Sequence, residues 1–183
     1  MSRKRSLVGL AGLAACLLSI GHASTIQRLS FDALIDQSDL IVSGTITRSW
    51  TAWGSSHRYI WTHYEMAVSG AAKGTPGATV TISEPGGVLD GQGFAVGGAV
   101  VYQPGETVLV FLNRVPNGYL RTTGWAQGKC AIDQFGRLHG GVSLRDVAPA
   151  TAKSGASSLE GLTLQQAFTR IAAHTRGNPG RTQ

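Results

Sequence analysis

Cysteine is almost missing from this chain, which has Cys16 and Cys130 as its two cysteines among 183 residues. Cys16 falls within an expected leader sequence, so the mature chain keeps one thiol and cannot form an intrachain disulfide. A small domain without disulfides depends on its hydrophobic core for stability. Cys130 is therefore interpreted as a small buried apolar side chain.

Runs of basic residues and nucleotide-binding motifs are also missing. The chain has 16 Lys and Arg against 10 Asp and Glu. The basic residues are scattered rather than interleaved with aromatic ones, so nucleic-acid binding is not expected. No glycine-rich phosphate loop follows a strand pattern, and Gly-x-Ser-x-Gly does not occur. The sequence therefore favours a protein that is not an enzyme and needs no cofactor.

Residues 1–23 have the three parts of a secretory signal peptide, namely a basic start, an apolar stretch over 7–20 and a Gly-His-Ala cleavage site. We therefore expect a mature chain that begins at Ser24 and is secreted or periplasmic. A competing interpretation is a lipoprotein, because the Leu-Ala-Ala-Cys ending at Cys16 resembles a bacterial lipobox. Membrane attachment is expected only in that case, through lipid on Cys16.

Strand patterns predominate after the leader. The run from Arg58 to Val68 alternates with period two and is rich in aromatic and β-branched residues, which predicts a strand. At about 3.3 Å per residue the run would span about 36 Å, so we expect it to coil and to serve two parts of a small barrel. Gly44 predicts a bulge or sharp coil in an earlier strand. Shorter strand patterns occur at 40–47, 78–83, 107–112, 119–123, 129–133 and 137–139. An Asn-Gly pair at 117–118, between two of these strands, predicts a hairpin turn.

Two helices complete the expected fold. Ser30 has the chemistry of an N-cap for a short helix over 31–37. Thr163 and Gln166 have the spacing of a capping box, which predicts the start of a C-terminal helix. A small antiparallel OB-like β-barrel with these two helices is therefore the expected, mainly β fold.

The domain organisation follows from these patterns and from composition. An Ala-, Ser- and Gly-rich stretch separates the last strand pattern from the C-terminal helix. The expected order is a signal peptide at 1–23, a β-barrel domain at 24–147, a linker at 148–158, a helix at 159–177 and a disordered tail at 178–183.

Aromatic residues concentrate around one expected loop. Trp50 and Trp53 lie in a loop expected over 50–56, and Trp61 follows on the long strand. Exposed aromatic side chains often anchor protein partners, although they also fill cores. A second loop is expected over 84–98, where frequent glycine makes regular structure improbable. The expected partner surface joins the mature N-terminus to these aromatic residues: Ser24, Thr25, Trp50, Trp53 and Trp61.

Two sets of residues could support chemistry instead. His63 and Glu65 lie two apart on a strand, so their side chains share a face and could begin a metal site. Such a site would need one or two more ligands, and His57 and His139 are candidates if the fold brings them together. Cys130 and His139 could form a nucleophile and base across a turn. The alternatives are a solvated strand face and a buried thiol.

Three blocks of residues occur in order between 38 and 133. They are Ser-Asp-Leu-Ile-Val with a following Gly44, then the long strand with Lys-Gly at its end and Val-x-Ile beyond, then Pro-Gly-Glu before an apolar strand. This order resembles netrin-like modules, including the tissue inhibitors of metalloproteinases. It is also similar to uncharacterised secreted bacterial proteins that share Asp-Leu-Ile-Val and a Gln-Gly-Lys block, here ending at Lys129. The resemblance implies an OB-type barrel.

The inhibitors in that family begin with a Cys whose amine and carbonyl chelate the protease zinc. Here the expected first residue is Ser24, whose free α-amine would have to take that role. We therefore expect a secreted, non-enzymatic binding module with a protein partner in the cell envelope or medium, in the manner of a protease inhibitor. The alternatives are a metal- or thiol-dependent hydrolase using His63 and Glu65 or Cys130, and a structural envelope protein.

Overall fold

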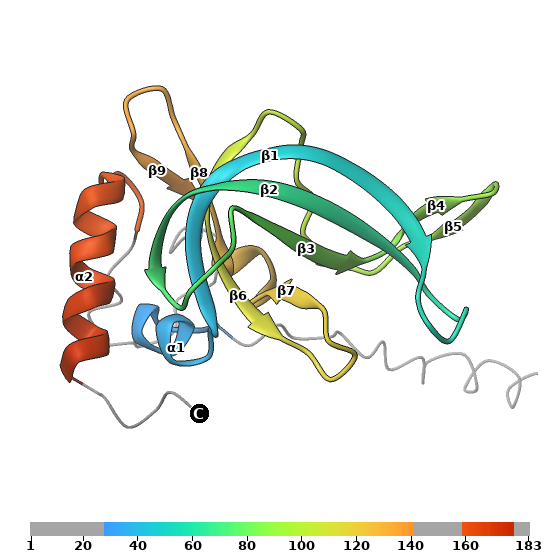
Figure 1. Cartoon of the computed structure of the whole chain (residues 1–183), viewed down its shortest axis with the longest axis horizontal. Coiled ribbons are helices and arrows are strands. Elements are labelled where there is room, and N and C mark those ends of the chain that lie inside the picture. Colours follow the sequence, from blue (N-terminus) through green and yellow to red (C-terminus); the bar gives the residue numbers. More distant parts are fainter. Residues whose placement is uncertain (1–27, 141–158, 178–183) are drawn as a thin grey trace, which may run out of the picture.

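A computed structural model describes residues 28–140 and 159–177 (Figure 1). This part of the chain is mainly β, with a seven-stranded mixed sheet, a two-stranded hairpin and helices at both ends. The elements are α1 Phe31–Asp36, β1 Leu40–Trp53, β2 Ile60–Lys73, β3 Thr79–Pro85, β4 Gly87–Leu89, β5 Gln92–Phe94, β6 Thr107–Arg114, β7 Leu120–Thr122, the 3-10 turn η1 Trp125–Gly128, β8 Lys129–Ile132, β9 Leu138–Gly140 and α2 Leu164–Gly177.

Several expectations lie outside the described residues. These are the leader at 1–23 with Cys16, the mature start at Ser24 and Thr25, the linker at 148–158 and the tail at 178–183. They stay predictions of the sequence.

Two long antiparallel strands, β1 and β2, form a curved ribbon over the molecule (Figure 1). The expected long coiled strand is confirmed, since β2 runs from Ile60 to Lys73. Gly44 lies at one of three register shifts in the ribbon, as the bulge prediction requires. A Cβ at Gly44 would overlap the carbonyl oxygen of Ala67, so the close approach of the strands at the bend needs glycine.

The strand pairings form a circuit. β1 pairs with β6 as well as β2, and the order β1–β2–β3–β7–β6 returns to β1. β3 and β7 pair in parallel at one register position, Ile82 with Leu120. The expectation of a purely antiparallel sheet is therefore wrong. The cause is topological: the chain leaves β3, crosses to β6 and returns through the β6–β7 turn in the direction of β3.

Two clusters of apolar side chains form the core. The first lies within the circuit and contains residues such as Ile46, Tyr64, Met66, Ile82 and Val110. The second lies between the sheet and the helices and contains Leu34, Ile35, Phe111, Cys130, Leu138 and Ile171. Cys130 is fully buried in it, so its interpretation as a buried thiol is confirmed.

The C-terminal helix begins at the predicted capping box. Thr163 N–H donates to Gln166 Oε1 at 2.9 Å, and Gln166 N–H donates to Thr163 Oγ1 at 3.3 Å. Ile171 is buried against the second cluster. His174 lies 2.8 Å from Asp36 of α1, which joins the two helices at one end of the molecule. Among the described helices, none has the length and apolar character needed to cross a membrane.

The loop expected over 50–56 is mostly strand, so this expectation is wrong. β1 continues through Trp50 to Trp53, which pairs with Ile60 across a short turn. The pairing with β2 supplies the backbone hydrogen bonds that the local sequence pattern did not indicate. As a result Trp50 has a defined strand face.

The glycine-rich segment over 84–98 also differs from its expectation, because it contains the β4–β5 hairpin. Two hydroxyl groups of the ribbon hold the base of this hairpin. Thr62 Oγ1 donates to the Gly86 carbonyl at 2.7 Å, and Thr51 Oγ1 donates to the Val88 carbonyl at 2.9 Å. Tertiary hydrogen bonds therefore order a segment whose composition alone predicts irregular structure. The hairpin projects at the end of the molecule opposite the helices (Figure 1).

Candidate functional site

A continuous row of aromatic and cationic side chains lies on the outward face of the circuit. We call it the aromatic row, and its members in order of contact are Arg48, Trp50, His63, Tyr119, Trp61, Arg121 and Trp125. The rings of Trp50 and His63 stack with centroids 5.3 Å apart. The Tyr119 ring packs edge-on against the rings of His63 and Trp61, with centroid distances of 5.3 and 5.0 Å. The row thus connects β1, β2, the β6–β7 turn, β7 and η1.

Strand register explains the row. Trp50 lies opposite His63 in the β1–β2 ladder, so their side chains share a face. Trp61 precedes His63 by two residues and shares that face. Tyr119 arrives from the β6–β7 turn, where its N–H donates to Asn117 Oδ1 at 3.1 Å. The predicted Asn-Gly hairpin therefore positions an aromatic ring that no sequence argument singled out.

The two cationic members flank the row. The guanidinium of Arg48 lies 4.7 Å from the ring centroid of Trp50. That of Arg121 lies 4.7 Å from the ring of Trp125 and 5.8 Å from that of Trp61. Such cation–π contacts hold the rings in fixed orientations. Trp50 is 37% exposed, so the row presents aromatic surface to solvent rather than filling the core.

His63 is the buried centre of the row. Its side chain is 7% exposed, and its Nδ1 lies 2.8 Å from Ser83 Oγ. Burial lowers the pKa of His63 below its ordinary value, because the charged imidazolium loses hydration. The interpretation of His63 as part of a solvated strand face is therefore wrong, since Trp50 and Tyr119 cover it.

Titration of His63 should be linked to folding. With a folded pKa below the ordinary 6.5, His63 favours the unfolded state as pH falls, because the unfolded chain takes up the proton first. The contribution of neutral His63 to the free energy of unfolding is fully present above about pH 6.5. It is lost as the pH falls below that value, by about 1.4 kcal/mol for each unit by which folding lowers the His63 pKa. NMR titration of the imidazole and urea unfolding at pH 7.5 and 5.0 would measure both effects. His63→Gln should lose less stability over that range, and a His63 pKa at or above 6.5 would contradict the prediction.

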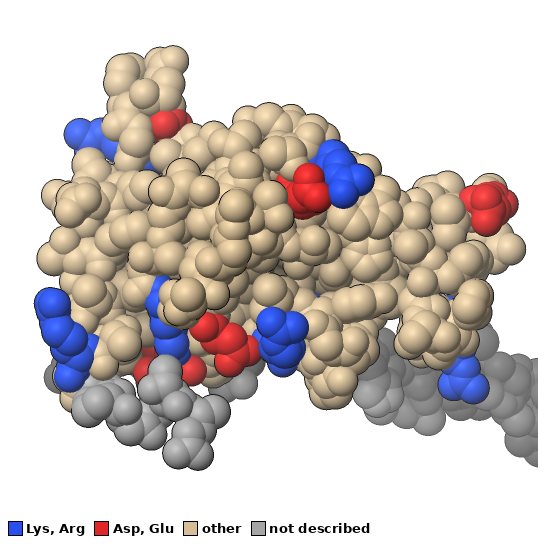
Figure 2. Space-filling model, viewed as in Figure 1, with Lys and Arg blue, Asp and Glu red and all other residues tan. Residues whose placement is uncertain are grey.

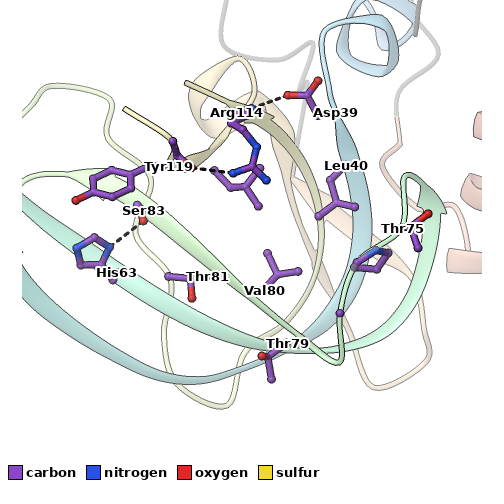
Figure 3. A pocket seen from close by; sticks show the side chains of 14 residues that line it. Asp39, Leu40, His63, Thr75, Thr79, Val80, Thr81, Ser83, Arg114 and Tyr119 are labelled. Atoms are coloured by element: carbon purple, nitrogen blue, oxygen red, sulfur yellow. Dashed lines mark hydrogen bonds between the residues drawn. The ribbon is translucent and has the colours of Figure 1, made fainter. Parts of the chain in front are cut away.

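A pocket of about 530 Å³ adjoins the row (Figure 3). His63 and Tyr119 line one end, and hydroxyl groups of β3 line a side. Arg114 lies between Tyr119 and Asp39, because its backbone N–H donates to Asp39 Oδ2 at 2.6 Å and its Nη1 donates to the Gly118 carbonyl at 2.9 Å. The pocket's remaining lining includes Leu40, Thr75, Thr79, Val80, Thr81, Ser83 and Leu120. It therefore combines an aromatic wall, neutral hydroxyls and one charge of each sign.

Ser83 and His63 have the separation of a nucleophile and a base, but the burial of Ser83 argues against catalysis. Ser83 lines the pocket but is 2% exposed, and its hydroxyl is already bonded to His63. The next residue, Glu84, is also buried and accepts the Thr122 N–H at 2.7 Å. The pair is better suited to fixing the imidazole beneath Trp50 than to attacking a substrate.

His63 and Glu65 do not share a ligand site. Glu65 Oε2 lies 2.8 Å from Arg48 Nη2, whereas His63 is bonded to Ser83. His57 lies in the β1–β2 turn, and His139 lies in β9 between Asp133 and Glu160. Within residues 28–140 and 159–177, no group of three or more His, Cys, Asp or Glu is placed to hold a metal ion.

Cys130 and His139 face different neighbours. Cys130 Sγ lies 3.9 Å from the Gly140 carbonyl inside the second cluster, and burial raises the pKa of its thiol to about 12. Both ring nitrogens of His139 contact carboxylates, with Nε2 2.8 Å from Asp133 Oδ2 and Nδ1 3.1 Å from Glu160 Oε1. These hydrogen bonds raise the pKa of His139. The geometry does not pair the thiol with this base.

The structure brings Trp50 and Trp61 into one surface but not Trp53. Trp53 lies three residues after Trp50 on a strand, so it points to the opposite face. Sequence reasoning missed Arg48, Tyr119 and Arg121. The alternation of Arg48, Trp50 and Ala52 would have revealed a strand face had the region not been expected to be a loop.

The surface charge agrees with the scattered basic residues of the sequence. On the face drawn in Figure 2, Lys and Arg are few, and several adjoin Asp or Glu. Comparison with protein-family models gives no match to this chain, and comparison with curated proteins gives none. The function is therefore argued from the geometry of the row and its pocket.

Proposed function

We propose that this chain is a secreted, non-enzymatic binding module that holds a protein partner on the aromatic row and the adjoining pocket. The observation that carries the proposal is the row itself, in which the partly exposed rings of Trp50, Trp61 and Tyr119, from β1, β2 and the β6–β7 turn, adjoin the buried ring of His63. Trp, Tyr and Arg are the residue types that contribute most binding energy at protein interfaces. Export of the protein to the envelope or medium rests on the signal-peptide pattern of residues 1–23.

Preorganisation supports the same proposal. The rings of Trp50, His63 and Tyr119 hold one another, and the guanidinium of Arg48 holds Trp50 from the side. A partner therefore meets side chains whose rotamers are already restricted, which lowers the entropy lost on binding. The pocket beside the row offers a concave receptor for one partner side chain, with hydroxyls and the Arg114 guanidinium at its rim.

We further propose that the circuit β1–β2–β3–β7–β6–β1 is an OB-like barrel and that the chain is related to netrin-like modules. The parallel β3–β7 pairing supports this, because it lets the five strands return on themselves. OB-folds bind ligands on their second and third strands and on the loops beside them. The row has that location, with Trp61 and His63 on β2, Ser83 on β3 and Tyr119 from the turn before β7.

Replacement of one exposed ring tests the function. Trp50→Ala should weaken capture of the partner by about thirtyfold, the usual loss for an aromatic anchor worth about 2 kcal/mol. The immobilised mature protein would be exposed to the native envelope fraction and medium, bound proteins identified by mass spectrometry, and the affinity of the purified partner measured for each variant.

Tyr59→Ala is the matched control. Tyr59 is 50% exposed and contacts Phe94 of the β4–β5 hairpin, outside the row. Its replacement removes a similar aromatic surface and should leave the affinity of the partner within twofold. Equal affinity for folded Trp50→Ala and the native protein would refute the proposed surface.

A further inference from the structure

A second pocket, of about 350 Å³, opens at the hairpin end of the circuit. We call it the mouth pocket. Its wall is formed by Phe94 at the end of β5 and by the segment that follows, with Val96, Ala99, Val100 and Val101 among the lining residues. Val101 is 59% exposed, whereas Val100 is 5% exposed. The apolar wall therefore leads from solvent toward the interior, and mouths of β-barrels are common positions for small-ligand sites.

A buried carboxylate lies at the inner side of this pocket. Glu84 continues the inward-facing series of Val80 and Ile82 on β3 and is 1% exposed. Its Oε1 accepts the Thr122 N–H at 2.7 Å, and its Oε2 lies 3.5 Å from Arg121 Nη2. Burial raises the pKa of Glu84. The Thr122 hydroxyl is a further hydrogen-bond partner of this carboxylate. A carboxylate has about four acceptor positions, so these three donors, with the Arg121 contact long, leave room for one more.

Close packing and hydrogen bonds fix the entrance of the mouth pocket. A Cβ at Gly87 would lie 2.8 Å from Thr51 Cγ2 and from Thr62 Oγ1, so the hairpin backbone packs directly on the ribbon. The Phe94 ring packs against Tyr59 with centroids 5.3 Å apart. Gly86 N–H donates to the Ile60 carbonyl at 2.8 Å. These contacts hold the apolar wall over Glu84.

We propose that the mouth pocket binds a small molecule with an apolar body and an uncharged hydrogen-bond donor head, such as an aliphatic alcohol, whose head donates to Glu84. The nearby guanidinium of Arg121 already balances the carboxylate. A cationic head would add an unbalanced charge to a buried site, and an anionic head would face Glu84 directly. A hydroxyl supplies one further donor to the carboxylate at the least desolvation cost.

This site and the proposed partner surface are lined by different residues, although Arg121 of the row also contacts Glu84. The mouth pocket shares no lining residue with the aromatic row, and its Glu84 faces inward where His63 faces outward. A protein that loses partner binding on Trp50→Ala can therefore keep the mouth pocket, and Val101→Ser at the pocket rim replaces no member of the row. The two proposals fail separately.

Three probes of equal chain length test the head group: 1-hexanol, hexylamine and hexanoate. The full chain, labelled with ¹⁵N, would be titrated with each while the Thr122 amide, which donates to Glu84, is followed by NMR. We expect saturable binding of 1-hexanol with a shift of the Thr122 resonance, and binding of hexylamine and hexanoate at least tenfold weaker. Equal binding of hexylamine, or no saturable binding of 1-hexanol in the millimolar range, would overturn the proposal.

Two kinds of variant make the test specific. Val101→Ser at the rim should weaken the binding of 1-hexanol by about three- to tenfold, because contacts with about one to two methylene groups are lost. Val88→Ser, a similarly exposed valine that does not line the pocket, should not change it. Glu84→Gln keeps an acceptor oxygen but leaves Arg121 unbalanced, so hexanoate should become the preferred probe. Equal effects of the two valine changes, or an unchanged preference in Glu84→Gln, would place binding elsewhere.

Discussion

Gly44→Ala is expected to lower the free energy of unfolding by about 3 kcal/mol, the upper part of the range for overpacking a closely packed site. The added methyl group would overlap the Ala67 carbonyl oxygen and lie 3.0 Å from Met66 Cγ. The overlapping atom belongs to the backbone of β2, so relief requires a shift of the whole ribbon. Gly44 also pairs with Val108 of β6, and the shift would disturb both neighbouring strands. Urea unfolding of the two proteins at pH 7.5 measures the difference.

Gly97→Ala is the matched control for this prediction. A Cβ at Gly97 meets no atom within 4 Å, so the change should stay within about 0.5 kcal/mol of the native protein. If Gly44→Ala lowers the free energy of unfolding no more than Gly97→Ala does, the ribbon can relax around the bend and the prediction is wrong. The comparison isolates strand approach from the general entropy difference between glycine and alanine.

The thiol of Cys130 should react about a thousandfold more slowly in the folded protein than in the unfolded chain. Burial raises its pKa from 9.0 to about 12, and three pKa units lower the thiolate fraction by about a thousandfold. The side chain is 0% exposed, so steric shielding adds to the effect. Reaction with Ellman's reagent at pH 8, with and without urea, would measure the ratio in a Cys16→Ser background.

An introduced surface thiol provides the reference rate. Phe135 is 75% exposed at the β8–β9 turn, so Phe135→Cys in a background with Cys16→Ser and Cys130→Ala should react at the rate of a free thiol. Fast reaction of native Cys130, close to that of this variant, would contradict the structural interpretation. It would also restore the thiol-dependent hydrolase as a candidate function.

Local signals predicted several elements because their cause lies within a few residues. Ser30 caps α1 as expected, with Ala33 N–H donating to Ser30 Oγ at 3.1 Å. The Thr163–Gln166 capping box opens α2 for the same reason. The Asn-Gly hairpin was also correct, since Gly118 has the φ of 85° that such a turn requires.

Non-local pairing produced the errors. Trp50 was expected in a loop, yet its pairing with His63 extends β1 beyond the apolar part of its sequence. The parallel β3–β7 contact joins Ile82 to Leu120 across a long sequence separation, which no local pattern encodes. The burial of His63 follows from Tyr119, a residue from another strand pair. Each depends on contacts that form only after the strands assemble.

By itself, the sequence determined the β-rich class, the long coiled strand, both helix caps and the burial of Cys130, because propensity, alternation and hydrogen-bonding side chains act over short distances. Only the tertiary structure decided the strand circuit, the aromatic row and the position of Glu84 in the mouth pocket. All three depend on strand register, which determines the residues that lie opposite one another and therefore the side chains that share a face. Register is determined by packing of the whole core.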